Sequence, residues 1–153
     1  MDDQFWMRIA LHEAESAMHH GDVPVGAVAV HRNRIIAIGR NQREQANDPT
    51  AHAEILAMRA AAHVLGHWRL EEVTLYCTLE PCPMCAGAMV LARLPRLVFA
   101  TTDPKGGAGG SVMNILSHPS LNHRVEVSSG VLQEEAATLL RKFFARLRAE
   151  GQK

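Results

Sequence analysis

The chain has little of what marks secreted or membrane-spanning proteins. Its 153 residues include only three cysteines, two of them in one local Cys-x-x-Cys pair, which is too few for a disulfide framework. Charged side chains interrupt residues 1–21, so this region has neither the apolar core of a signal peptide nor the apolar length of a membrane span. We therefore expect a cytoplasmic protein with reduced thiols.

An excess of charge is also missing. Sixteen Lys and Arg residues balance sixteen Asp and Glu residues, so net charge gives no indication of a nucleic-acid partner. Cations do gather in residues 141–148, a segment with two adjacent phenylalanines and no acid. Such a segment suits a phosphate backbone or forms an ordinary solvated helix face, and the sequence leaves both interpretations open.

The chain does have enough apolar material for a core. Hydrophobic residues make up 47% of it, and repeats, long linkers and low-complexity segments are absent. A chain of this length and composition fits one domain, which we expect to span residues 1–153.

The spacing of apolar residues predicts alternating helices and strands. Trp6, Ala10 and Ala14 recur at helical intervals, and Gly21 ends this first helix after His20. Strands are expected at residues 25–30, 34–39, 73–79, 97–100 and 124–127, and further helices at 51–63, from Pro81 onward, at 112–116 and at 133–148. A hairpin followed by this alternation predicts an α/β fold, a three-layer α/β/α sandwich around a mixed sheet of about five strands.

Two motifs that carry chemistry fall at predicted helix starts. His52 and Glu54 belong to a His-Ala-Glu triplet in the first turn of one helix, which Thr50 can cap. Residues 81–85 read Pro-Cys-Pro-Met-Cys, with Pro81 suited to the first helical position. In α/β sheets, ligands bind beyond the carboxyl ends of the strands and face such helix starts.

The residue types of these motifs are those of a catalytic zinc site. Cys82 and Cys85 lie three apart on one helix face, about 5–6 Å apart at Cβ, and the helix dipole favours their thiolate forms. With His52 they supply three ligands, which leaves the fourth position of a tetrahedron open for water. Zinc would lower the pKa of that water to about 7 and so provide hydroxide at neutral pH.

Glu54 is better suited to proton transfer than to metal binding. It would accept the proton of the attacking water, deliver it to the ring nitrogen beside the attacked carbon and help ammonia leave. An exocyclic amine would thereby become a carbonyl. His-x-Glu together with Pro-Cys-x-x-Cys therefore predicts the hydrolytic deamination of a nucleobase.

Other interpretations of these residues stay open. A distant histidine such as His118 or His123 would close a purely structural zinc site with a fourth ligand. A Cys-x-x-Cys pair by itself also fits a redox pair. Cys77 shares a strand face with Leu75 and Leu79, which predicts a buried free thiol rather than a ligand.

Several segments beyond the zinc motifs resemble one family. They are residues 23–28 (Val-Pro-Val-Gly-Ala-Val), Asn41, residues 48–54, residues 78–89, residues 103–111 (Asp-Pro-Lys-Gly-Gly-Ala-Gly-Gly-Ser) and residues 121–125 (Leu-Asn-His-Arg-Val). The chain resembles the bacterial tRNA-specific adenosine deaminases, which convert adenosine to inosine at the wobble position of an arginine tRNA anticodon. The resemblance implies a cytidine deaminase-like fold, one Zn²⁺ per subunit, a homodimer, and binding of the tRNA anticodon stem-loop across both subunits.

The resemblance also implies roles for substrate-binding residues. Asn41 would hydrogen-bond the flipped-out base, while Asp103 and Lys105 would contact the RNA sugar or backbone, Asp103 through a ribose 2′-hydroxyl. Turn chemistry is the alternative for Asn41 and Asp103. Thr102 departs from the family pattern, because some relatives have an arginine there that would add a phosphate contact. The further substrate contacts that we expect come from Leu79, His123 and Phe144.

Two other functions remain candidates. The zinc and glutamate motifs mark a whole superfamily of deaminases, so a deaminase of a free base or nucleoside, such as cytosine or guanine, is the first alternative. A non-catalytic protein that binds zinc and RNA is the second. Glu54 argues against the second alternative, because such a protein needs no carboxylate at that place.

Overall fold

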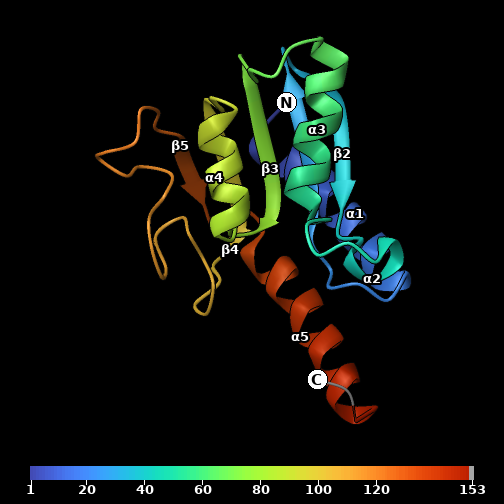
Figure 1. Cartoon of the computed structure of the whole chain (residues 1–153). Coiled ribbons are helices and arrows are strands. Elements are labelled where there is room, and N and C mark those ends of the chain that lie inside the picture. The colour runs from blue at the N-terminus through green and yellow to red at the C-terminus, as the bar shows by residue number, and fades with distance from the viewer. Residues whose placement is uncertain (152–153) are drawn as a thin grey trace.

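A mixed five-stranded sheet forms the centre of the computed structural model, which describes residues 1–151 (Figure 1). In spatial order its strands are β2 (Arg34–Arg40), β1 (Gly26–His31), β3 (Val73–Leu79), β4 (Arg96–Thr101) and β5 (Glu126–Ser129). β1 runs antiparallel to β2 and β3, β4 runs parallel to β3, and β5 runs parallel to β4. The domain expected over residues 1–153 includes two residues that lie outside the described part.

Helices cover both faces of the sheet. Helices α3 (Ala53–Leu65) and α4 (Pro83–Leu91) pack on one face, and α1 (Asp3–His19) and α5 (Gln133–Ala149) pack on the other (Figure 1). A short helix, α2 (Arg43–Ala46), lies between β2 and α3 in the sequence. The predicted three-layer α/β/α sandwich with a mixed sheet of about five strands is confirmed. Across residues 1–151, the structure contains no helix that is both long and apolar enough to cross a membrane.

The two faces of the sheet carry separate hydrophobic layers, because side chains alternate along each strand. On β3, Leu75 and Cys77 belong to the layer under α3 and α4, whereas Tyr76 belongs to the layer under α1 and α5. Leu75 and Leu97 are fully buried, and each such leucine contributes about 2 kcal/mol relative to an exposed side chain. These layers hold in place the strand ends from which the functional segments leave.

Helix α3 begins two residues later than expected. His52 has an extended backbone, with φ −82° and ψ 147°, so it precedes α3 and does not lie in its first turn. The Thr50 hydroxyl donates to Asp48 at 2.8 Å and does not cap the helix. Instead, Asn41 Oδ1 accepts a hydrogen bond from the Ala53 amide at 2.9 Å. The predictions for Thr50 and for the position of His52 were wrong because a residue of the preceding hairpin supplies the cap.

Helix α4 also begins two residues after the expected start at Pro81. Pro83 lies in its first turn, and Cys82 directly precedes it with an extended backbone. The Pro81 carbonyl accepts a hydrogen bond from the Ala108 amide at 2.8 Å, which holds Pro81 in the extended segment that leaves β3. A proline still opens the helix, where its missing N–H is not needed.

The helix expected at residues 112–116 does not form. This segment consists of turns, bends and one isolated bridge residue. Its backbone bonds to the glycine-rich loop at residues 103–111, since the Val112 amide donates to the Gly107 carbonyl and the Ile115 amide donates to the Ala108 carbonyl. Hydrogen bonds to the loop replace those that a helix would have supplied.

The last strand lies two residues beyond the expected range of 124–127. The Val125 amide donates to the Leu116 carbonyl at 2.8 Å, so pairing with β4 begins only at Glu126, opposite Arg96. A neighbouring loop therefore sets the first residue of β5, and local alternation of residue types carries no information about it.

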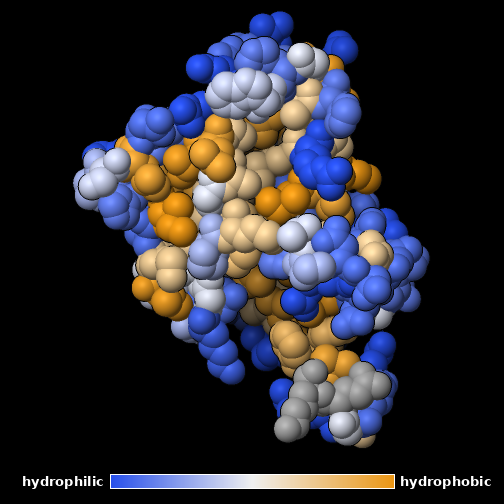
Figure 2. All heavy atoms as spheres, in the orientation of Figure 1, coloured by the Kyte–Doolittle hydropathy of each residue, from blue (hydrophilic) through white to orange (hydrophobic). Residues whose placement is uncertain are grey.

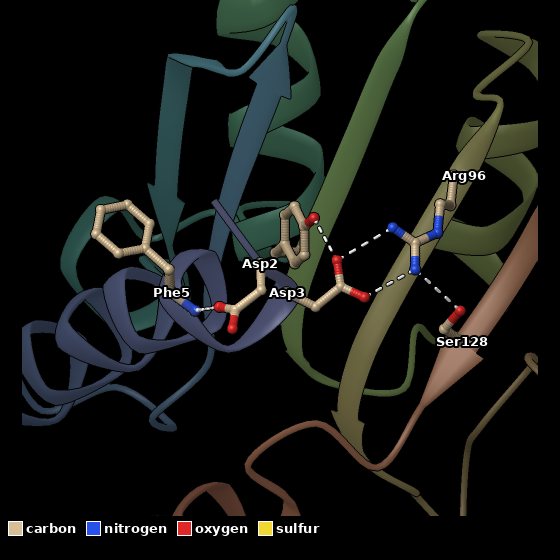
Figure 3. A network of polar contacts seen from close by, with 6 residues as sticks. Asp2, Asp3, Phe5, Arg96 and Ser128 are labelled. Carbon is tan, nitrogen blue, oxygen red and sulfur yellow. Dashed lines mark hydrogen bonds and ion pairs between the residues drawn. The ribbon is translucent and has the colours of Figure 1, made fainter.

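A polar network joins the start of α1 to three strands (Figure 3). The Asp3 carboxylate accepts hydrogen bonds from both terminal nitrogens of Arg96 on β4, at 3.1 and 2.8 Å, and from the Tyr76 hydroxyl of β3 at 2.7 Å. Arg96 also donates to the Ser128 hydroxyl of β5 at 3.2 Å. The hydrogen bond from Arg96 lowers the pKa of Asp3, so this carboxylate remains charged and makes strong, charge-assisted contacts.

Candidate active site

Three side chains that can bind a metal ion meet beyond the carboxyl end of β3. His52 Nδ1 lies 3.6 Å from Cys82 Sγ and 3.5 Å from Cys85 Sγ. Zinc with a Zn–N distance of about 2.0 Å and a Zn–S distance of about 2.3 Å holds tetrahedral nitrogen and sulfur ligands about 3.5 Å apart. Within residues 1–151, this is the one group of three or more His, Cys, Asp or Glu side chains close enough to share an ion. The donor set and its dimensions fit zinc.

The fold brings these ligands together from two helix starts. His52 directly precedes α3, Cys82 directly precedes α4, and Cys85 lies in the first turn of α4. Helix α3 can approach β2 because Gly39 has no side chain, and a Cβ there would overlap the carbonyl oxygen of Ala53. Two helix N-termini therefore face one point, where their dipoles stabilise negative charge on sulfur.

The pKa values of the three side chains shift in different directions. A hydrogen bond from the Cys85 thiol, together with one from His52, lowers the pKa of Cys82 to about 3. The contact with Cys82 raises the pKa of Cys85, and the hydrogen bond with Cys82 also raises the pKa of His52. Cys82 is therefore a thiolate at neutral pH, which is the form that binds metals.

Glu54 lies in the same pocket as the ligands without being one of the metal-binding group. Its side chain belongs to the first turn of α3 and is almost fully buried, at 4% exposure. This burial raises the pKa of its carboxyl group. A carboxyl group with a raised pKa can accept and return a proton near neutral pH.

His52 and Cys82 line a pocket with a volume of about 850 Å³. Cys85 is fully buried behind it. Most of the expected site residues line the pocket, namely Asn41, His52, Glu54, Leu79, Cys82, Asp103, Lys105 and Phe144. The structure thus brings residues that precede the cysteine pair in the sequence and residues that follow it to one cavity.

His123 is not brought into this pocket. Its ring Nε2 lies 2.7 Å from the Leu94 carbonyl oxygen, which is consistent with a structural hydrogen bond. Neither His118 nor His123 belongs to the metal-binding group of the described residues, so the four-ligand structural site is not formed. An RNA contact by His123 stays a prediction.

Asn41 serves the fold and faces the pocket at once. Its Oδ1 accepts from the Ala53 amide, while no hydrogen bond of its Nδ2 group is formed to other described residues. Because Asn41 lines the pocket, that amide nitrogen is available to a ligand. The two interpretations of Asn41, as a local structural residue and as a binding residue, are therefore compatible.

The third cysteine is not one of the metal-binding group. Cys77 is fully buried and free, as the alternation along β3 predicts. Burial raises its pKa well above the ordinary range, so it is a neutral thiol.

Three exposed cations of the pocket wall were not among the expected site residues: Arg43 on α2, and Arg141 and Arg148 on α5. Arg141, Phe144 and Arg148 recur at positions i, i+3 and i+7, which places them on one helix face, and this signal was present in the sequence. Arg43 gave no comparable signal, because α2 is only one turn long. Together with Lys105, these side chains make the outer wall cationic.

Comparison with known proteins gives the chain a family. A family model described as MafB19-like deaminase matches residues 1–148. The tRNA-specific adenosine deaminase of Bacillus subtilis is 51% identical over 146 residues, which cover 95% of this chain and 91% of that protein. The tRNA-specific adenosine deaminase of Aquifex aeolicus is 46% identical over 148 residues, which cover 97% of both chains.

Solved structures share the fold and differ in substrate. A structure from studies of A-to-I editing by tRNA:A34 deaminases at the wobble position of transfer RNA has a TM-score of 0.86 and 46% identity, covering 89% of this chain and 99% of that one. A guanine deaminase from Nitrosomonas europaea has a TM-score of 0.82 and 25% identity, covering 94% and 85%. Fold similarity is thus nearly equal for the two, whereas sequence identity clearly favours the first. The chain belongs to the family of tRNA-specific adenosine deaminases.

Proposed function

We propose that this chain catalyses the hydrolytic deamination of adenosine to inosine at the wobble position of an arginine tRNA anticodon. One observation carries the proposal: a buried carboxyl group, Glu54, and a metal-binding His-Cys-Cys group share one pocket whose outer wall is cationic. The names of the relatives, which refer to adenosine and to tRNA, support the substrate.

His52, Cys82 and Cys85 hold one zinc ion in this proposal. Two sulfur donors and one imidazole, at the distances described above, favour zinc over metals that prefer oxygen ligands. When bound, zinc supplies Lewis-acid chemistry that makes water nucleophilic at neutral pH.

Glu54 transfers the protons. Its carboxylate takes a proton from water as the water oxygen bonds to C6 of adenine, and it delivers that proton to the neighbouring ring nitrogen N1. The second proton of the water goes to the exocyclic amine, the C6–N6 bond breaks, and ammonia leaves. Burial of Glu54, which raises its pKa, stabilises the protonated form that this cycle requires.

The inner part of the pocket holds the base. Asn41 donates through Nδ2 to an acceptor atom of the purine, and Leu79 offers an apolar contact to its ring. Phe144 is 41% exposed at the wall of the pocket, so its ring can stack on a neighbouring unpaired base.

The outer part of the pocket holds the RNA backbone. Asp103 accepts a hydrogen bond from a ribose 2′-hydroxyl, which a DNA strand lacks. Lys105, Arg141 and Arg148 contact phosphates of the anticodon stem-loop, and this positive wall explains how a chain without net charge binds RNA.

A homodimer belongs to the same proposal, with its interface over α4 and the segment that follows β4. Apolar side chains gather on this face of the molecule (Figure 2), where Leu91 is 70%, Val112 50% and Met113 43% exposed. Exposed apolar side chains that gather on one face are typical of protein interfaces. Light scattering of the protein and of a Leu91→Glu variant tests the interface, since a dimer that the variant disrupts supports it and a monomeric starting protein contradicts it.

The proposal places the reaction in the cytoplasm. Cys82 and Cys85 have to be reduced in order to bind a metal, and Cys77 is a free thiol as well. A reducing compartment keeps all three in that form.

Deamination of free guanine is the second candidate, because the Nitrosomonas europaea guanine deaminase shares the fold. The cationic wall formed by Arg43, Lys105, Arg141 and Arg148 favours RNA over a free base, which has no phosphate to bind.

The decisive experiment offers both kinds of substrate to the zinc-loaded protein. One sample contains an arginine tRNA anticodon stem-loop with adenosine at the wobble position, and the others contain free adenosine, cytidine, cytosine or guanine. Inosine formed only in the stem-loop supports the proposal. Ammonia released only from a free base or nucleoside overturns the substrate, and silence on all of them favours a non-catalytic protein that binds zinc and RNA. Glu54→Ala serves as the inactive control.

A further inference from the structure

Glu80 is a buried acid that neither binds the metal nor transfers a proton in the proposed reaction. It lies between the end of β3 and the Pro-Cys motif, and only 2% of its side chain is exposed. Its carboxylate accepts hydrogen bonds from the amides of Asp103 at 2.9 Å, Gly109 at 2.9 Å and Ser111 at 3.0 Å, and from the Ser111 hydroxyl.

These contacts bring the two ends of the glycine-rich loop at residues 103–111 to one carboxylate. Oε1 accepts from the Asp103 amide and the Ser111 hydroxyl, whereas Oε2 accepts from the amides of Gly109 and Ser111. Both oxygens are therefore used, and each of them bonds to two groups. A carboxylate is the one side-chain group of this size that accepts four such bonds without presenting a donor of its own.

The loop closes tightly around this carboxylate. A Cβ atom at Gly107 would overlap with Cδ and both oxygens of Glu80, so only glycine fits at that position. All four groups that bond to the Glu80 carboxylate are donors, which is the pattern of an ionised carboxylate, so these hydrogen bonds are charge-assisted.

The hydrogen bond that the Asp103 amide donates to Glu80 holds the backbone of Asp103 in place. While its own amide donates to Glu80, the Asp103 side chain accepts through Oδ1 from the amides of Lys105 and Gly106, at 3.1 and 3.2 Å. Asp103 and Lys105 line the pocket, and Glu80, although only 2% exposed, also borders it and bonds to the backbone of their loop. Glu80 therefore affects the substrate indirectly, through the backbone of this loop.

We infer that Glu80 is a positioning residue for RNA binding, which holds Asp103 and Lys105 in the conformation that meets the substrate. This inference rests on the RNA contacts proposed above for Asp103 and Lys105. An ordered loop binds RNA without first losing conformational freedom, so a loosened loop should weaken binding more than it slows the chemical step.

Glu80→Gln is the first test, because glutamine has the same size but presents an NH₂ group to two of the four donors. We expect amide hydrogens of Asp103, Gly109 and Ser111 to exchange about tenfold faster in the free protein, since they lose charge-assisted partners. We expect KM for the stem-loop to rise about tenfold while kcat changes much less. The metal content should not change. Glu71→Gln is the matched control, since Glu71 is exposed and lies outside this loop.

Ser111→Ala is a milder variant in case Glu80→Gln folds poorly. It removes one of the four donors and keeps the backbone amide, so its effects on exchange and on KM should have the same direction and be smaller. Unchanged amide exchange in both variants would contradict the loop contacts. Faster exchange with an unchanged KM would make Glu80 a purely structural residue.

A double-mutant cycle shows whether Glu80 acts through Asp103. If it does, Glu80→Gln should raise KM much less in the Asp103→Asn background than in the unmodified protein. Additive effects would overturn the inference. An unchanged KM in Asp103→Asn by itself would instead overturn the proposed RNA contact of Asp103, and amide exchange, which needs no substrate, would still report the loop contacts separately.

Discussion

The side-chain oxygen of Asn41 accepts a hydrogen bond from the Ala53 amide at 2.9 Å, which ties the end of the β1–β2 hairpin to the first residue of α3. Ala53 stands between His52 and Glu54, so one side chain positions both the proposed metal ligand and the proposed proton-transfer residue. The oxygen of this amide serves the fold, whereas its nitrogen is available to the pocket. Substitutions can therefore separate the two roles.

Asn41→Asp keeps the acceptor for the Ala53 amide and removes the donor toward the base. We expect the free energy of unfolding to stay within about 0.5 kcal/mol of the original, because aspartate is an equally good helix cap, whereas Asn41→Ala should lose about 1 kcal/mol. Both variants should lower kcat/KM on the stem-loop by about tenfold or more. Urea denaturation and steady-state kinetics measure these effects. Full activity in Asn41→Asp would rule out a base contact through Nδ2.

Glu54→Gln should abolish turnover without releasing the metal. The amide has the shape of the carboxyl group but cannot shuttle protons, so we expect kcat to fall by about 10²–10⁴-fold. Because a buried carboxyl group is replaced by a neutral one, stability should be unchanged or higher. Single-turnover assays with metal analysis of the same sample test this, and normal turnover would remove Glu54 from the mechanism.

Cys82→Ser should lose the metal and, with it, stability, because metal binding is coupled to folding. Cys77→Ala is the matched control, since Cys77 is a buried cysteine outside the metal-binding group. It should retain its metal while losing about 1 kcal/mol of stability through the cavity left by the sulfur. Metal analysis and thermal denaturation with and without a chelator distinguish the two variants. Full metal occupancy in Cys82→Ser would contradict the ligand assignment.

Asp103→Asn should reduce the preference for RNA over DNA. The Asp103 Oδ1 contacts to the amides of Lys105 and Gly106 can persist in the variant, but a donor replaces the second oxygen, which is the one expected to accept a 2′-hydroxyl. We expect the activity ratio between a stem-loop with adenosine and one with deoxyadenosine at the target position to fall about tenfold. The same ratio in both proteins would show that Asp103 does not read the sugar.

The contact of Asp3 with Arg96 should make stability depend on acid pH. The hydrogen bond from Arg96 lowers the pKa of Asp3 below its value of 3.8 in an unfolded chain. A carboxyl group of this kind stabilises the fold above that pH, and the stabilisation is lost as pH falls through the lower pKa of the folded state. Asp3→Asn should therefore cost about 1 kcal/mol at pH 7 and less at pH 3, which lies below the ordinary value of 3.8. Urea denaturation at both pH values measures the difference, and an equal cost at both would contradict this role of the charge.

Local patterns in the sequence were sufficient for most of the architecture. The strand expected at residues 73–79 coincides with β3, and the helix expected at 133–148 differs from α5 by one residue. The spacing of apolar residues within a short segment distinguishes a helix from a strand, and this spacing does not depend on the rest of the chain. The spacing of Cys82 and Cys85 is of the same kind, since helix geometry alone places them near one another.

Contacts between distant segments decided the remaining features. Asn41, not Thr50, caps α3. The loop at residues 103–111 forms hydrogen bonds with the backbone of residues 112–116, which therefore form no helix. Arg43 and Arg148 reach the same pocket although about a hundred residues separate them in the sequence, and Glu80 collects its four hydrogen bonds from a loop beyond the next strand.

The sequence by itself thus determined the five strands, the long helices, the three-layer architecture and the residue types of the candidate site. Only the tertiary structure decided where helices begin, which cations face the pocket and what holds the substrate loop. The physical reason is one of energies. Differences in local propensity are below about 1 kcal/mol per residue for most residue types, so hydrogen bonds and burial supplied by distant residues outweigh them wherever the two disagree.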